Sequence, residues 1–344
     1  MDLLQASQRL VPELAQKFRS RYRVLQRIFL HQPIGRRSLA QVLGTTERIL
    51  RADVELFKEQ GLIDVGPIGM SVTDAGEILL ADLDKVIRKL DGRRELEQQL
   101  ASVLAISRVT VVPGDCEQDD AVMRDIGHAA AQMLQGYIVP PCTVAVTGGS
   151  TMATLAEMMP RVISTQQVEV LPARGGLGER VELLANTIAS QLADKLGGTY
   201  RMFHVPESLS KATVERLSKE PVIQEMAERI RRADIVVHGI GDALTMALRR
   251  QLDDDTVAIL QSSGAVAEAF GYYFDAQGAI VYTMNTVGMR LEDLAEIDVV
   301  IAVAGGRAKG AAIRAASRAY QIDALVTDEG AARAILEFAD VGTH

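Results

Sequence analysis

The 344-residue sequence predicts an α/β protein in which an N-terminal winged helix-turn-helix precedes a large α/β domain with a parallel sheet. Three observations predict it. Residues 1–60 hold eleven Lys/Arg against six Asp/Glu, whereas the remainder is acidic. Apolar residues in this basic head recur at helical spacing. From residue 106 onward, short β-branched runs alternate with polar turns and helix-period stretches, a pattern typical of parallel sheets covered on both faces.

Composition narrows the class of protein. No run of eighteen uncharged apolar residues occurs, and the first twenty residues lack the basic-then-apolar order of a secretory signal. Cys116 and Cys142 have no histidines at metal-ligand spacing, so we expect reduced packing cysteines, no metal site and a cytoplasmic protein. The net charge of −8 with a basic head is typical of a protein that meets DNA at one end.

The first element expected is a helix over residues 9–30, followed by a helix-turn-helix over residues 34–65. Ser38 is expected to cap a short helix, Gly44 to allow the left-handed corner, and Thr45 or Thr46 to cap a second helix. Ala40 is small enough for the helices to cross closely. The apolar side chains expected to face the core from the second helix are Ile49, Leu50, Val54 and Phe57.

Residues 62–73 read as a strand–turn–strand wing. The predicted DNA contacts come from the residue types that reach phosphates and base edges in a major groove. They are Arg36, Arg37, Ser38, Thr45, Thr46, Arg48 and Arg51. The alternative is a three-helix module used for protein contacts.

Helices over residues 75–105, broken at residues 91–94, are expected to link the head to the body. Their apolar stripe serves either as a dimer interface or in packing on the chain's own body.

The resulting domain plan is a DNA-binding domain over residues 1–75, a helical linker over 76–105, and an effector-binding and oligomerisation domain over 106–344. Six strands are expected in the last domain. They begin the runs at residues 109–115, 143–151, 168–176, 235–242, 299–310 and 324–330. Ligands bind beyond the carboxyl ends of such strands. Leu244 and Ala311 break the dinucleotide and P-loop patterns, which argues against both nucleotides.

The turns favour a simpler phosphate ligand. Glycines at residues 147–151 let backbone N–H groups approach an anion at the positive end of a helix. The predicted effector-binding residues combine this turn with cations from other turns and one carboxylate. They are Gly148, Gly149, Ser150, Thr151, Arg174, Arg249, Arg250, Glu268 and Lys309. Each cation alone is more often a solvated surface charge, and Glu268 has the alternative of an ordinary helix-surface charge.

The motifs TGGST (147–151), PARGG (172–176), GYYF (271–274) and AGG (304–306), with the winged head, resemble the SorC/DeoR family of sugar-responsive bacterial transcriptional repressors over essentially the whole chain. The resemblance implies a body related to sugar-phosphate isomerases and glucosamine-6-phosphate deaminases. It also implies fructose-1,6-bisphosphate as inducer, operator DNA at glycolytic genes, and homodimers or homotetramers. The absence of a long apolar run predicts that the protein has no membrane partner.

The same resemblance implies a role for each candidate residue. One phosphate would bind at residues 148–151, Arg174 and Arg250 (or Arg249) would take part, Glu268 would face the sugar hydroxyls, and Lys309 would add a cation. A polar ligand contact of the family falls on Leu184 here, so we expect part of the sugar contact to differ.

Two other functions stay open beside the repressor. One is a sugar-phosphate isomerase or deaminase, for which Glu268, Asp328, Lys309 and His238 offer acid–base groups. The other is a constitutive DNA-bound scaffold that holds a sugar phosphate for stability alone. Nothing in the residue spacing demands catalysis, and a DNA-binding head has no evident use for turnover. We therefore expect a sensor with no cofactor and no enzyme activity.

Overall fold

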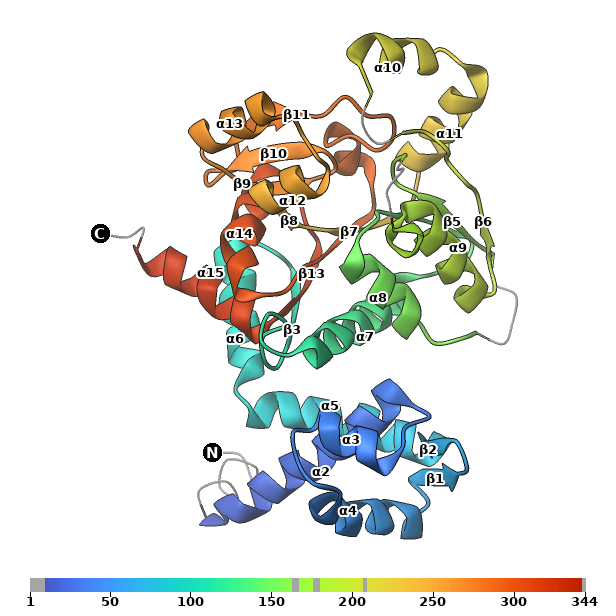
Figure 1. Cartoon of the computed structure of the whole chain (residues 1–344), viewed down its shortest axis with the longest axis vertical. Helices are drawn as coiled ribbons and strands as arrows, with labels where there is room; N and C mark the ends of the chain where they lie inside the picture. Colours follow the sequence, from blue (N-terminus) through green and yellow to red (C-terminus); the bar gives the residue numbers. More distant parts are fainter. Residues whose placement is uncertain (1–9, 163–166, 176–179, 207–208, 342–344) are drawn as a thin grey trace. The chain divides into compact units, whose positions relative to one another are not determined.

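Separate hydrophobic cores divide the chain into two units, with the boundary between Leu96 and Glu97. The computed structural model describes residues 10–162, 167–175, 180–206 and 209–341 (Figure 1). The two units are described one at a time below.

The N-terminal unit is a helix-turn-helix followed by an antiparallel wing, as predicted. Its elements are α2 (Pro12–His31), α3 (Arg36–Val42), α4 (Glu47–Glu59), β1 (Ile63–Gly66), β2 (Gly69–Val72) and α5 (Asp74–Leu90). The core joins apolar residues of all the helices to the wing, through Leu25, Leu39, Phe57 and Met70. The predicted left-handed corner is confirmed, because Gly44 has φ +59° and the next N–H, of Thr45, donates to the Ala40 carbonyl at 2.9 Å.

Two details of the helix-turn-helix differ from the prediction. Gly35 takes the N-cap position that was assigned to Ser38. The Leu39 N–H already donates to the Gly35 carbonyl at 2.9 Å, so the helix is wound before Ser38 is reached. Thr46 does precede α4 as its N-cap, but its side chain makes no capping hydrogen bond.

Ile49 also differs from the prediction, since its side chain is 64% exposed rather than in the core. The buried stripe of α4 runs through Leu50, Val54 and Phe57 at intervals of four and three residues. Successive residues of an α-helix are turned by about 100° around its axis, so Ile49 lies outside the stripe that contains Leu50.

Asp91 and Gly92 separate α5 from α6 (Arg93–Leu104), the break expected from the sequence. Among the helices of the described residues, none has both the length and the apolar character that crossing a bilayer requires.

The C-terminal unit is built on a seven-stranded sheet in which every pairing is parallel. Its order is β3-β13-β12-β7-β4-β5-β6. The strands are β3 (Arg108–Val112), β4 (Cys142–Val146), β5 (Val168–Pro172), β6 (Thr199–Tyr200), β7 (Ile235–Gly239), β12 (Val299–Val303) and β13 (Ala324–Asp328). All six predicted strands are present. The two-residue β6 was not predicted because it is too short to show a periodicity.

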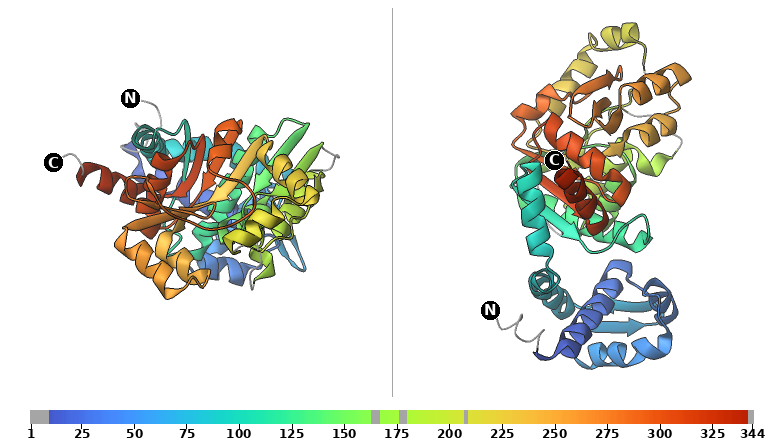
Figure 2. Two further views of the ribbon diagram at one scale, coloured as in Figure 1. Left: turned by 90° about the horizontal axis from the view of Figure 1, so that it is seen from above. Right: turned by 90° about the vertical axis from the view of Figure 1, so that its left-hand side faces the viewer.

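Helices cover this sheet, and Figure 2 shows the layers from two further directions. On one face, α7 (Asp120–Tyr137), α8 (Ser150–Met158) and α9 (Ala185–Leu196) enclose the main core with alternate residues of the strands. On the other face, the His238 ring of β7 contacts the rings of Phe270 and Tyr320, so the segments carrying those rings lie over that side.

A second, antiparallel sheet of order β11-β10-β9-β8 was not predicted. Its strands are β8 (Gly241–Asp242), β9 (Ala265–Ala269), β10 (Tyr272–Asp275) and β11 (Ile280–Thr283). Glu268 therefore lies on a strand and is 4% exposed, and the helix-surface alternative for it is wrong. The remaining helices are α10 (Lys211–Leu217), α11 (Pro221–Arg231), α12 (Ala243–Arg249), α13 (Asp254–Ser262), α14 (Gly310–Ala319) and α15 (Glu329–Val341).

Candidate functional site

A cleft of about 760 Å³ opens beyond the carboxyl ends of β4, β5, β7 and β12. This is the edge at which parallel sheets bind ligands. The cleft lies within the C-terminal unit. All nine residues predicted for the effector line it, namely Gly148, Gly149, Ser150, Thr151, Arg174, Arg249, Arg250, Glu268 and Lys309.

The turn between β4 and α8 forms one wall. Gly149 has φ +119°, which an L side chain rarely adopts, and α8 begins at the next residue. A Cβ atom on Gly148 would lie 2.7 Å from the Leu183 carbonyl oxygen. The first N–H groups of a helix have no acceptor inside the helix, so the start of α8 offers donors to an anion. The Gly149 N–H itself donates to the Leu183 carbonyl at 2.9 Å.

A second helix start at the cleft was missed by the sequence reasoning. Ala185, the first residue of α9, lines the cleft, and its N-cap is Leu184. Two helices thus turn their positive ends toward the same space. Leu184 itself lines the cleft, so the apolar side chain stands where the family resemblance places a polar contact. No cap residue of the Ser/Thr/Asp type precedes α9, which removes the usual sequence signal for such a start.

A buried charge cluster forms the floor. Arg250 Nη1 lies 2.8 Å from Glu268 Oε1, and Arg174 Nη1 lies 3.7 Å from the same oxygen. The Gly271 N–H donates to this oxygen at 2.7 Å. Burial acts to raise the pKa of Glu268, but Arg250, Arg174 and this N–H outweigh it and hold the pKa below its ordinary value. Glu268 is ionised and already paired with the two arginines in this structure.

The other two predicted cations, Arg249 and Lys309, differ from each other in exposure. Arg249 is exposed, and Lys309 is partly buried at the end of a 3-10 turn, Arg307–Lys309. Burial lowers the pKa of Lys309, while Cys116, Asp328 and Glu117 oppose that shift. Arg180 also lines the cleft and was not predicted, although it lies just beyond the PARGG motif.

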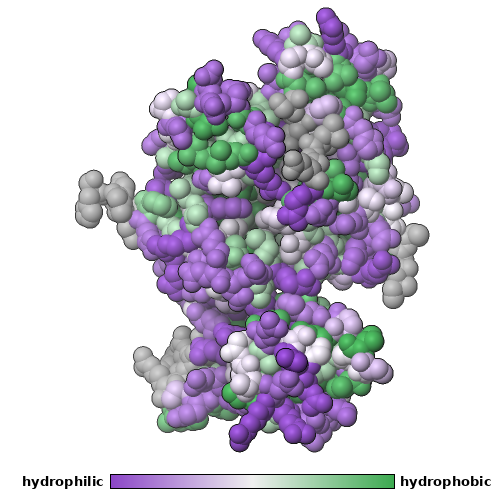
Figure 3. Space-filling view, in the orientation of Figure 1, coloured by the Kyte–Doolittle hydropathy of each residue, from purple (hydrophilic) through white to green (hydrophobic). Residues whose placement is uncertain are grey.

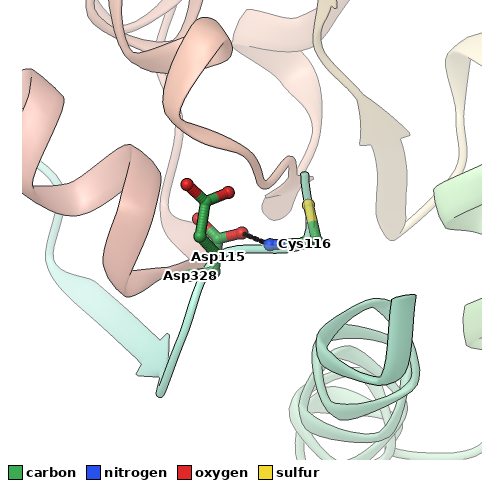
Figure 4. A group of neighbouring side chains, drawn as sticks. All are labelled: Asp115, Cys116 and Asp328. Atoms are coloured by element: carbon green, nitrogen blue, oxygen red, sulfur yellow. Dashed lines mark hydrogen bonds between the residues drawn. The ribbon is translucent and has the colours of Figure 1, made fainter. Parts of the chain in front are cut away.

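Asp115, Cys116 and Asp328 form a group whose potential ligand atoms lie within 4.8 Å of one another (Figure 4). Asp328 accepts hydrogen bonds from the N–H groups of Cys116 at 2.9 Å, Gly306 at 2.8 Å and Ala331 at 2.9 Å. Burial, together with the hydrogen bond to Asp328, raises the pKa of the Cys116 thiol to about 12. A protonated thiol and a carboxylate occupied by three amides tie together the loops after β3, β12 and β13.

His238, the other titratable group considered for acid–base chemistry, is 0% exposed. Burial lowers its pKa to about 4. The ring contacts Phe270 and Tyr320, with ring centres 4.6 Å and 5.6 Å away. His238 is therefore a neutral, packed residue at ordinary pH.

The predicted DNA contacts lie on the outside of the N-terminal unit. Arg36, Arg37, Ser38, Thr46, Arg48 and Arg51 are exposed, and Thr45 is partly exposed. Asp53 ties α4 to α2, since its carboxylate lies 2.9 Å from both Lys17 Nζ and Arg21 Nε. Residues 61–73, which include the wing, hold no Lys or Arg. Figure 3 shows apolar side chains at the wing and a mainly hydrophilic surface over α4.

Comparison with known proteins assigns each of the two units to a protein family. Residues 18–87 match the CggR N-terminal DNA-binding domain family, and residues 88–337 match a sugar-binding domain family. The chain is 45% identical to the central glycolytic genes regulator of Priestia megaterium over 97% of this chain and 98% of the relative. It is 41% identical to that of Bacillus subtilis, with the same coverage.

Solved structures agree with this fold. A structure from Enterococcus faecalis assigned to the SorC family of transcriptional regulators is 42% identical, covers 70% of this chain and 99% of its own, and has a TM-score of 0.66. The full-length sorbitol operon regulator SorC of Klebsiella pneumoniae shares the fold at 18% identity, with a TM-score of 0.69 over 92% of this chain and 98% of that chain. The chain therefore belongs to the central glycolytic genes regulators, a family that joins a DNA-binding head to a SorC-type sugar-binding domain.

Proposed function

We propose that this protein is a cytoplasmic repressor of central glycolytic genes that fructose-1,6-bisphosphate releases from operator DNA. The sugar bisphosphate binds in the cleft of the C-terminal unit, and the head binds the operator. The observation that carries the proposal is the convergence of the predicted effector residues, with two helix starts, on a single cleft.

The charges in the cleft suit a bisphosphate. Among the described residues that line the cleft, Arg174, Arg180, Arg249, Arg250 and Lys309 supply five cations, which Glu268 offsets by one. Each phosphate carries about −1.5 to −2 at neutral pH, so a bisphosphate brings roughly −3 to −4. The cleft volume lies within the range of about 300–1,000 Å³ that is usual for ligand sites.

The proposed mechanism couples this cleft to the DNA-binding head through contacts between subunits. Dimers pair through their C-terminal units and present two heads to operator half-sites. The bisphosphate draws the loops of the cleft together, changes the contacts between subunits and weakens cooperative binding to the operator. Because coupling between two ligands is reciprocal, the operator weakens the affinity for the bisphosphate by the same factor, a coupling of about 1–3 kcal/mol.

The test is a titration of DNA that the wild-type chain selects from a randomised library, at fixed salt, with and without fructose-1,6-bisphosphate. Arg174→Ala and Thr151→Ala should bind the DNA as the wild type does but lose the response to the sugar. Arg161→Ala is the matched control, because Arg161 pairs with Asp194 and is not among the residues that line the cleft. A wild-type response in both cleft variants rejects the assignment of the phosphate site.

The rival function is a sugar-phosphate isomerase or deaminase. The carboxylate of Asp328 is held by three backbone N–H groups and Glu268 by two arginines, so neither is poised as a free base. Incubation with fructose-6-phosphate and related sugars, followed by a search for isomerised or deaminated product, tests this function directly. The scaffold function predicts instead that the bisphosphate raises the Tm and leaves operator affinity unchanged.

A further inference from the structure

Ile49 is an apolar side chain in the first turn of α4, next in sequence to the predicted contact Arg48. It is 64% exposed, while the next residue, Leu50, is 3% exposed. Single exposed apolar residues are common on protein surfaces and need no explanation by themselves. The position of Ile49 is what requires one, because it lies in the first turn of the second helix of a helix-turn-helix.

The surroundings of Ile49 are suited to nucleic acid. Arg48 and Arg51 are exposed on the same helix, and Arg36 and Arg37 are exposed at the start of α3. Cations of this kind hold phosphates, and residues at the start of the second helix meet base edges in the major groove. A partner with negative charge around an apolar feature fits this surface better than an apolar protein face does.

The major-groove edges of the bases carry one kind of apolar group, the C5-methyl of thymine. We propose that Ile49 is a specificity-determining residue whose side chain packs against a thymine methyl group in the operator. This inference rests on the proposed function, in that it requires the head to bind DNA sequence-specifically. It assigns to α4 a base contact that neither the charged nor the hydroxyl side chains provide.

Deoxyuridine offers a direct test, because it pairs as thymine does but lacks the methyl group. The probe is the duplex that the full wild-type chain selects from a randomised library, with each thymine replaced in turn by uracil. For the wild type, uracil at one position per half-site should weaken binding roughly fourfold, the change expected for losing burial of one methyl-sized group. Ile49→Ala should bind the thymine duplex more weakly and show no further loss with uracil at that position.

Two control variants and two further measurements make the result specific. Ile49→Val keeps a branched apolar side chain and should keep the preference for thymine. Ile78→Ala removes an equally exposed isoleucine, 67% exposed on α5, and should behave as the wild type does. The dependence of affinity on salt should be unchanged in Ile49→Ala, because no phosphate contact is removed. Its Tm should also be unchanged, since the side chain is exposed.

The inference is overturned if Ile49→Ala and the wild type lose affinity equally at every uracil position. It is also overturned if Ile49→Ala changes the oligomeric state and leaves the thymine preference intact, which would assign the side chain to a protein contact. Failure of the proposed function would give different results. In that case the wild type selects no sequence from the library, or its binding ignores fructose-1,6-bisphosphate.

Discussion

Replacing Glu268 with glutamine tests whether this carboxylate holds the cleft arginines in place. Glu268 is 4% exposed, and the side chains of Arg250 and Arg174 are 11% and 7% exposed. Removing one charge of a buried pair costs about 3–5 kcal/mol, because the remaining charge loses its compensation in a medium of low dielectric constant. Glutamine still accepts the Gly271 N–H, so we expect the lower end, about 3 kcal/mol.

The expected loss is large enough to measure by thermal or denaturant unfolding. For a domain of this size, each 1 kcal/mol shifts the Tm by about 2–4 °C, so Glu268→Gln should lower it by roughly 6–12 °C. A bound phosphate returns negative charge to the arginines. The rise in Tm on adding fructose-1,6-bisphosphate should therefore be larger for Glu268→Gln than for the wild type.

The control is Glu182→Gln, which removes an exposed carboxylate that pairs with the exposed Arg180 and should leave the Tm unchanged. A Tm for Glu268→Gln within 1 °C of the wild type would refute the argument that the carboxylate compensates the arginines. A smaller rise in Tm on adding the bisphosphate than in the wild type would instead support the contact with sugar hydroxyls that the family resemblance implies.

Three other changes have defined outcomes. The pKa of His238 falls from 6.5 to about 4 on folding, so the unfolded chain takes up a proton at a higher pH than the folded chain does. The free energy of unfolding should therefore fall by about 2 kcal/mol between pH 7 and pH 5. In denaturant titrations His238→Gln should remove this loss, whereas His204→Gln, at an exposed histidine, should retain it. Gly148→Ala places a Cβ atom 2.7 Å from the Leu183 carbonyl oxygen. This clash should weaken bisphosphate binding at least tenfold, measured by calorimetry. An unchanged affinity would mean that the segment around Leu183 moves to accommodate the methyl group. Arg51→Ala should cost about 1–3 kcal/mol of specific binding, whereas Arg36→Ala should weaken specific and non-specific DNA alike and reduce the salt slope by about one; equal effects of the two changes would contradict this division of roles.

Six of the seven strands in the parallel sheet could be predicted, because a buried parallel strand shows as a continuous β-branched run followed by a turn. The residues at the ends of such strands converge for topological reasons, and this is why Gly148, Arg174 and Lys309 were found together without knowledge of the strand order. The tight turn before α8 was predictable for a similar reason, since two glycines between a buried strand and a helix are typical of such a turn.

The antiparallel sheet was not predictable in the same way. β9 and β10 meet through Phe270 and Gly271, at φ +53° and +84°, and phenylalanine is an unusual residue for such a conformation. The strand carrying Glu268 reads AVAEA, and alanine and glutamate favour helices when local preference alone decides. Pairing with β8 and β10, and the charges of two arginines from distant segments, determine its conformation instead.

Ile49 and Glu268 depart from the burial expected of their types in opposite directions. One is an apolar residue left outside, and the other is a carboxylate buried within the fold. Folding alone favours neither arrangement. A polar residue at position 49 would be better solvated, and an apolar residue at position 268 would avoid the cost of burying a charge. Both lie where a partner is proposed to bind, a base edge for Ile49 and a phosphorylated sugar for the arginines beside Glu268. Local rules of burial fail most often at functional sites, and the two proposals place Ile49 and Glu268 at such sites.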